Sequence, residues 1–152
     1  YLHGGDQEQK KRAGTENLVA IVGMVAALKE DLDYQVDHYQ KLSTLKATFL
    51  EEIADLDYYL NESHNQLPYV FNIGFPGQKN DLLLLRLDLE GISISTGSAC
   101  TAGIVQTSHV LEAFYGPDSP RLKESVRISL SPLNTEEELK QLAQTLKNII
   151  GD

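Results

Sequence analysis

Hydrophobic positions in the first third of the chain follow the spacing of one long helical face. Apolar residues recur every three or four positions from Leu18 to Leu56, which is the period of an amphipathic helix. Residues 15–17 supply the side chains typical of a helix start. The pattern predicts either one very long helix or two helices broken near 31–33, and a helix of that length usually connects two packing units.

The remaining two thirds alternate between short strand patterns and helical patterns. In chain order they predict strand 69–73, helix 80–89, strand 92–94, helix 108–115, strand 125–130 and helix 135–149. Asn80 is expected to cap the first of these helices and Gly91 to end it. Thr135 and Glu138 have the spacing of a capping box. The order predicts an α+β fold, a small antiparallel or mixed sheet with helices packed on it, preceded by the long N-terminal helix.

Composition and net charge exclude several classes of protein and of binding partner. The 152 residues are one domain's length, with 41% hydrophobic and 23% charged residues, as in ordinary globular proteins. The net charge of −9 disfavours direct nucleic-acid binding and attraction to an anionic membrane. No apolar run is long enough for a bilayer span, and no signal-peptide pattern opens the chain. One cysteine excludes an intramolecular disulfide, so the cytoplasm is the expected location.

Cys100, the single thiol of the chain, lies among small residues at 95–103, two of which are glycine. A free cysteine is commonly a small buried hydrophobe. A core cysteine usually sits among large apolar side chains, however, and the small neighbours here leave space for a substrate. The segment therefore favours a nucleophilic thiol over a structural one.

Two further residues are candidates for binding anions. Thr15 follows a glycine-containing loop at 3–14 and opens a helix, where backbone N–H groups favour an anion, although simple N-capping explains it equally well. Arg127 lies inside a predicted strand. Its side chain either faces solvent or binds a carboxylate through two parallel hydrogen bonds. The four histidines lack metal-ligand spacing, so no metal site is expected.

These segments together resemble one enzyme family. Residues 4–8 and 12–17 resemble the GGGQE and R-S-G-T-E-N stretches of NifS-type cysteine desulfurases, and residues 95–100 resemble their S-S-G-S-A-C loop. Residues 108–111, 126–130 and 134–138 follow in the family's order. The resemblance covers essentially the whole chain.

The resemblance implies a C-terminal portion of a pyridoxal 5′-phosphate (PLP) enzyme of the class V aminotransferase family, with fold type I. Such enzymes convert L-cysteine to L-alanine and pass the sulfur to an acceptor protein for iron–sulfur cluster assembly or tRNA thiolation. By resemblance, Cys100 carries the sulfur as a persulfide, Arg127 binds the substrate carboxylate, and Thr15 binds the cofactor phosphate across a homodimer interface. Residues 1–30 would be the tail of the large cofactor domain, and 31–152 the small C-terminal domain.

One feature of the family pattern is missing from these 152 residues. The lysine that binds the cofactor lies upstream of the segment matched by residues 4–8, and no lysine here fits its motif. We therefore expect the chain to be part of a longer protein and inactive alone. The alternative is a standalone sulfur-carrier or scaffold module that needs no cofactor. Selenocysteine lyase activity is a close variant of the enzyme interpretation.

Overall fold

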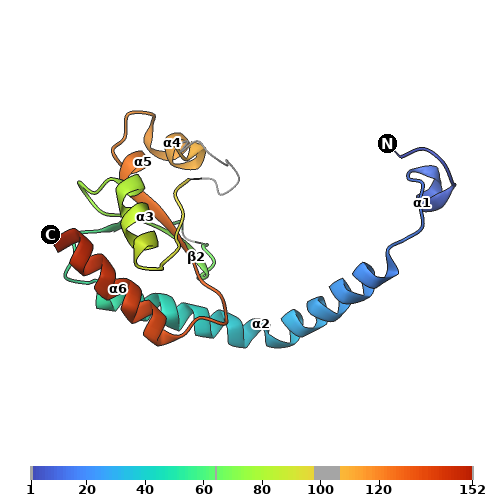
Figure 1. Ribbon diagram of the computed structural model, residues 1–152, viewed down its shortest axis with the longest axis horizontal. Coiled ribbons are helices and arrows are strands. Elements are labelled where there is room, and N and C mark those ends of the chain that lie inside the picture. The colour runs from blue at the N-terminus through green and yellow to red at the C-terminus, as the bar shows by residue number, and fades with distance from the viewer. Residues whose placement is uncertain (1, 64, 98–106, 152) are drawn as a thin grey trace. The chain divides into compact units, whose positions relative to one another are not determined.

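The computed structural model describes residues 2–63, 65–97 and 107–151 (Figure 1). The chain divides into two compact units, Tyr1–Asp37 and His38–Asp152. Each unit is considered by itself below. Cys100 lies outside the described residues.

The long helix predicted from the apolar spacing is continuous. Helix α2 spans Leu18–Glu52, 35 residues, so the alternative with a break near 31–33 is wrong (Figure 1). The Asn17 carboxamide oxygen accepts a hydrogen bond from the Ala20 N–H at 3.1 Å, which makes Asn17 the capping side chain. Ahead of it, the predicted loop contains a short turn, α1 (Gln7–Lys10), in which Glu8, Gln9 and Lys10 have positive φ.

The two halves of α2 differ in what they bury. The buried residues of α2 are Leu42, Leu45 and Phe49, all in the second half. In the first half the large apolar side chains are exposed, among them Leu18, Val19, Val22, Met24, Leu28 and Leu32. The apolar spacing predicted the helix correctly, but among the described residues only its second half meets a core.

Among the described residues, the sheet of the second unit has three antiparallel strands in the order β1–β2–β3. They are β1 (Tyr59–Leu60), β2 (Val70–Gly74) and β3 (Ser125–Ser129). In the β2–β3 register, Asn72 lies opposite Arg127. This small antiparallel sheet with packed helices and a preceding long helix confirms the predicted α+β class.

The strand predicted at 92–94 is wrong. Only Ser95 pairs with the sheet, as an isolated bridge to Arg127. Ile92 and Ile94 are partly buried against the core, so their alternation reflects packing of a connecting segment and not a strand ladder. Strand β1 was missed because two residues are too few to show an alternating pattern.

In the described part of the second unit, the helices that follow α2 are α3 (Asn80–Leu89), α4 (His109–Tyr115), α5 (Arg121–Glu124) and α6 (Glu136–Gly151). The capping box of α6 is confirmed, since the Glu138 N–H donates to Thr135 Oγ1 and the Thr135 N–H donates to Glu138 Oε2. Gly91, with φ +75°, follows the end of α3 as predicted.

Asn80 does not cap α3, contrary to the prediction. The capping position belongs to Lys79, which makes no side-chain capping bond. The Asn80 carboxamide instead donates to the carbonyl oxygens of Leu122 and Ser125, at 3.3 and 3.0 Å. Asn80 is buried, and a buried amide needs hydrogen-bond acceptors. The two distant carbonyl oxygens supply them.

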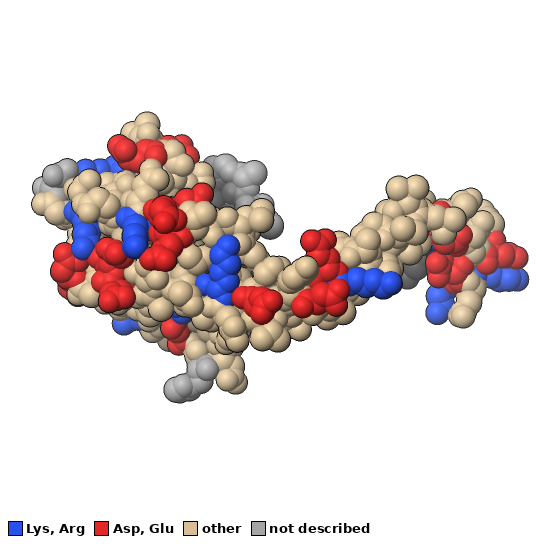
Figure 2. Space-filling model, turned by 90° about the horizontal axis from the view of Figure 1, so that it is seen from below, with Lys and Arg blue, Asp and Glu red and all other residues tan. Residues whose placement is uncertain are grey.

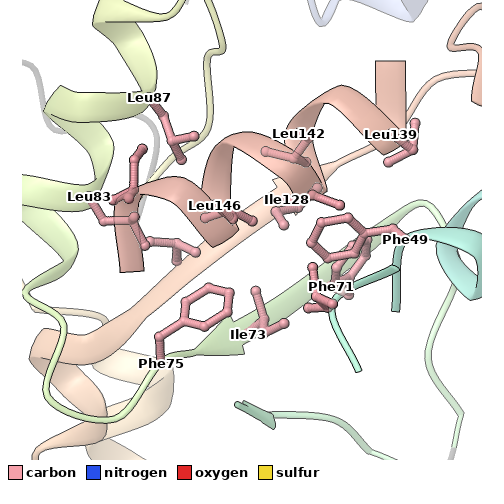
Figure 3. Packing of buried hydrophobic residues seen from close by; sticks show 14 of the residues in the cluster. Phe49, Phe71, Ile73, Phe75, Leu83, Leu87, Ile128, Leu139, Leu142 and Leu146 are labelled. Carbon is pink, nitrogen blue, oxygen red and sulfur yellow. The ribbon is translucent and has the colours of Figure 1, made fainter. Parts of the chain in front are cut away.

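The hydrophobic core lies on one face of the sheet. Phe71 and Ile73 of β2 and Ile128 of β3 point toward the leucines of α6, and Phe49 of α2 closes the cluster (Figure 3). The Phe49 and Phe71 ring centroids are 5.7 Å apart. Because side chains alternate along a strand, the opposite face of the sheet receives the polar residues of β2 and β3.

The surface charge and the helices were both compared with the expectations from the sequence. On the face drawn in Figure 2, the basic side chains of the described residues are dispersed among acidic ones and do not merge into a patch. Within the described ranges, no helix combines the length and apolar character needed to cross a membrane.

Candidate functional site

Arg127 lies in the middle of β3, on the polar face of the sheet. Its neighbours Val126 and Ile128 are buried in the core, so strand alternation turns Arg127 to the other side. Backbone hydrogen bonds with Ser95, of 2.6 and 3.1 Å, fix this part of the strand. The side chain is half-buried, which differs from the solvent-facing alternative.

The Arg127 guanidinium lacks acceptors for part of its hydrogen-bonding capacity. Its Nη1 donates to the Gly97 carbonyl oxygen at 3.3 Å. Its Nε is buried and has no hydrogen-bond partner among the described residues. No carboxylate of the described residues forms an ion pair with it. A buried cationic N–H without an acceptor is costly, so the position is suited to an anionic ligand.

A chain of hydrogen bonds runs across the same face beside Arg127. The Asn61 Nδ2 donates to Asn72 Oδ1 at 2.7 Å and to Ser125 Oγ at 2.9 Å. The Asn61 Oδ1 in turn accepts from Arg121 Nη1 at 2.8 Å. Asn61 therefore connects the segment after β1 with strands β2 and β3 and with helix α5.

Arg121 is held between two tyrosine rings. Its guanidinium carbon lies 4.1 Å from the Tyr59 ring centroid and 4.6 Å from that of Tyr115. The Tyr59 hydroxyl donates to Glu124 Oε2 at 3.3 Å. Burial raises the pKa of Tyr59 above its ordinary value, so the hydroxyl remains a donor at neutral pH. We call Tyr59, Tyr115 and Arg121 the arginine clamp.

The described residues on both sides of the Cys100 segment line one hollow of about 390 Å³. Thr96 and Gly97, which precede that segment in the chain, and Thr107 and Ser108, which follow it, all line the hollow. The remaining lining residues are Lys79, Asn80, Asp81, Leu111, Leu122, Lys123 and Ser125. Cys100 itself is outside the described residues, so its nucleophilic and structural interpretations both remain predictions.

Thr15 belongs to the first unit, whereas Arg127 belongs to the second. Thr15 is exposed and lies between Gly14, with φ +103°, and the start of α2. The first turn of α2 contains no acidic residue. Glu16 lies between Thr15 and the helix, and its carboxylate pairs with Arg12 at 3.9 Å. A hydroxyl donor next to a helix N-terminus is a donor set that fits one side of a phosphate group.

Asn61, Asn72 and Arg121 were missed by the sequence analysis. Asparagine is uncommon inside a strand, so Asn72 in the middle of β2 carried a weak signal. The other two have no local signature, because their partners are distant in the chain. In the part of the chain that the structure describes, no three His, Cys, Asp or Glu side chains gather as a metal site.

The family model for aminotransferase class-V matches residues 2–142. The cysteine desulfurase IscS of Dictyoglomus turgidum is 38% identical over 152 residues, 98% of this chain and 38% of the relative. IscS 1 of Bacillus subtilis is 41% identical over 152 residues, 98% of this chain and 40% of the relative. The chain thus spans about two fifths of the length of the relatives it matches.

Solved structures give the same picture. A NifS-like protein superposes with a TM-score of 0.82 and 26% identity, over 99% of this chain and 38% of that protein. The NifS-like protein from Rickettsia africae superposes with a TM-score of 0.80 and 28% identity, over 98% of this chain and 39% of that protein.

Proposed function

Because the chain belongs to the class-V aminotransferase family, we propose that it is the C-terminal part of a PLP-dependent cysteine desulfurase. The substrate is L-cysteine, the product is L-alanine, and Cys100 holds the released sulfur as a persulfide. The observation that carries the proposal is the half-buried Arg127, whose Nε has no acceptor. An amino-acid carboxylate is the kind of anion that satisfies such a group.

Each site residue has a separate task. Arg127 binds and orients the substrate carboxylate, and the Thr15 hydroxyl donates to the cofactor phosphate. PLP, when bound, supplies the electron sink that labilises the substrate. The Cys100 thiolate forms a bond to the substrate sulfur while the substrate carbon–sulfur bond breaks. The electron pair of the broken bond stays with carbon, which takes a proton and becomes the methyl group of alanine.

The finer points of the proposal come from the family resemblance. Residues 1–30 are the tail of the large cofactor domain and 31–152 the small domain. The enzyme is a cytoplasmic homodimer in which Thr15 serves the partner's site. The persulfide passes to an acceptor protein, for iron–sulfur cluster assembly or tRNA thiolation. The 152 residues alone are inactive because they lack the cofactor lysine.

A chimera provides the test. Residues 1–152 replace the matching portion of the Dictyoglomus turgidum cysteine desulfurase, and the chimera and the 152-residue chain each receive PLP and L-cysteine. The readouts are alanine and the intact mass under non-reducing conditions, with Cys100→Ser as the matched control. We expect alanine and one added sulfur atom on the chimera, no added sulfur on the control, and no alanine from the chain alone.

Each other outcome has a definite meaning. Alanine without sulfur on Cys100 contradicts the role of that residue. A chimera that binds PLP, as its absorbance shows, but forms no alanine contradicts the desulfurase proposal. If the chain alone, with no PLP of its own, gains sulfur from a separate PLP-loaded desulfurase, the carrier-module alternative is correct.

A further inference from the structure

Arg121 fixes which groups donate and which accept in the chain of hydrogen bonds beside Arg127. A guanidinium can only donate hydrogen bonds, so Arg121 requires Asn61 to present its carbonyl oxygen, Oδ1. The Asn61 Nδ2 is thereby turned toward Asn72, which must in turn present its own oxygen. Both asparagine carboxamides are therefore held in one orientation, and neither can flip without losing a bond.

This orientation leaves a pair of donors on Asn72. With Oδ1 engaged by Asn61, the Nδ2 group of Asn72 carries two N–H bonds for which the described residues supply no acceptor. Asn72 is half-buried in the middle of β2. Its Nδ2 is not among the fully buried atoms without a partner, so these N–H bonds are open to an incoming ligand.

Asn72 and Arg127 are directly opposite each other in the β2–β3 register. Opposite residues of an antiparallel pair share one face, with their Cβ atoms about 5 Å apart. The buried Nε of Arg127 also lacks an acceptor. Two neighbouring donor groups on one face, one of them cationic, thus both lack acceptors in the part of the chain that the structure describes.

We propose that Asn72 is a second binding residue for the substrate carboxylate, held as a donor by Asn61 and the arginine clamp. A single anion between Asn72 and Arg127 satisfies both groups. This inference rests on the proposed function, because the anion is the α-carboxylate of L-cysteine. Asn61 and Arg121 are positioning residues that act through Asn72.

The test compares Asn72→Ala with the isosteric Asn72→Asp in the PLP-loaded chimera. Binding that is equal in the ground and transition states changes KM and leaves kcat unchanged. Loss of a hydrogen bond to a charged group should raise the KM for L-cysteine about tenfold or more in Asn72→Ala. Asn72→Asp should raise it further, because its carboxylate repels the substrate and competes for Arg127.

A purely structural role predicts the opposite order. The aspartate retains an oxygen acceptor for Asn61, so Asn72→Asp would then be less damaging than Asn72→Ala. Thermal unfolding of each variant reports its stability, and the affinity for the product L-alanine reports binding of the carboxylate without catalysis. Asn148→Asp, an exposed change on α6, is the matched control for added charge and should leave KM unchanged.

Arg121→Met tests independently whether Arg121 positions Asn72 through Asn61. Without the guanidinium the Asn61 and Asn72 amides can flip, so KM should rise less than in Asn72→Ala while kcat stays near the unsubstituted value. An unchanged KM in Asn72→Ala, or Asn72→Ala more impaired than Asn72→Asp, overturns the inference. If the unsubstituted chimera forms no alanine, the proposed function fails instead, and the two failures are therefore distinguishable.

Discussion

Substituting Gly74 by alanine should disrupt the arginine clamp through a single methyl group. A Cβ atom at Gly74 would lie 2.3 Å from ring carbons of Tyr59 and 2.4 Å from its hydroxyl oxygen. Gly74 has no positive φ, so the conflict is steric and does not arise from backbone strain. The glycine is what allows the Tyr59 ring to lie directly over strand β2.

The magnitude follows from how far the ring must move. Ordinary contact between carbon atoms is about 3.5–4.0 Å, so the Tyr59 ring must shift by more than roughly 1 Å. That shift weakens its hydrogen bond to Glu124 and its contact with Arg121, which are both in place at 3.3 and 4.1 Å. Overpacking of this kind costs about 1–3 kcal/mol of unfolding free energy.

Urea unfolding of the 152-residue chain, followed by circular dichroism, measures the loss within a double-mutant cycle. In a Tyr59→Ala background, Gly74→Ala should be nearly neutral, because the added methyl group meets no ring. The coupling energy should then be about 1–3 kcal/mol. Gly91→Ala is the matched control, since its cost comes from φ +75° and should be the same in both backgrounds. Equal losses for Gly74→Ala in both backgrounds would refute the steric argument.

Other predictions concern the helices and the core. Thr135→Ala removes the N-cap of α6 and should cost about 1 kcal/mol in urea unfolding. The pKa of Glu138 lies below its ordinary value because the carboxylate accepts from the Thr135 backbone N–H. The unsubstituted chain should therefore be more stable than Glu138→Ala at a pH above the pKa that Glu138 has in the unfolded state. This advantage should be lost as the pH falls through the pKa of Glu138 in the folded state. Urea midpoints of both proteins at about pH 7 and about pH 3 test this. Leu146→Ala should cost about 2–5 kcal/mol, because the side chain is fully buried; a smaller loss contradicts the assigned core. Gly23→Ala should raise helical content by circular dichroism, since nothing lies near its Cβ position and alanine favours a helix by about 1 kcal/mol.

Local patterns were sufficient to predict most elements of the fold. The period of α2, the capping box of α6 and the alternation in β3 each depend on residues within a few positions of one another, and a sequence displays such patterns directly. The same holds for the family motifs around Thr15, Cys100 and Arg127. The functional roles of these three residues stay predictions.

What tertiary structure alone decided are the long-range partners. Asn80 was expected to cap a helix, but buried carbonyls 42 and 45 residues away compete for its amide. Arg121 and Asn61 are 60 residues apart and meet only because the segments flanking β1 and β3 are brought together by the sheet. The periodicity of a sequence reports which face of an element is buried. Which polar groups then satisfy one another depends on strand register and on the need of buried donors for acceptors, and both arise only when the chain is folded.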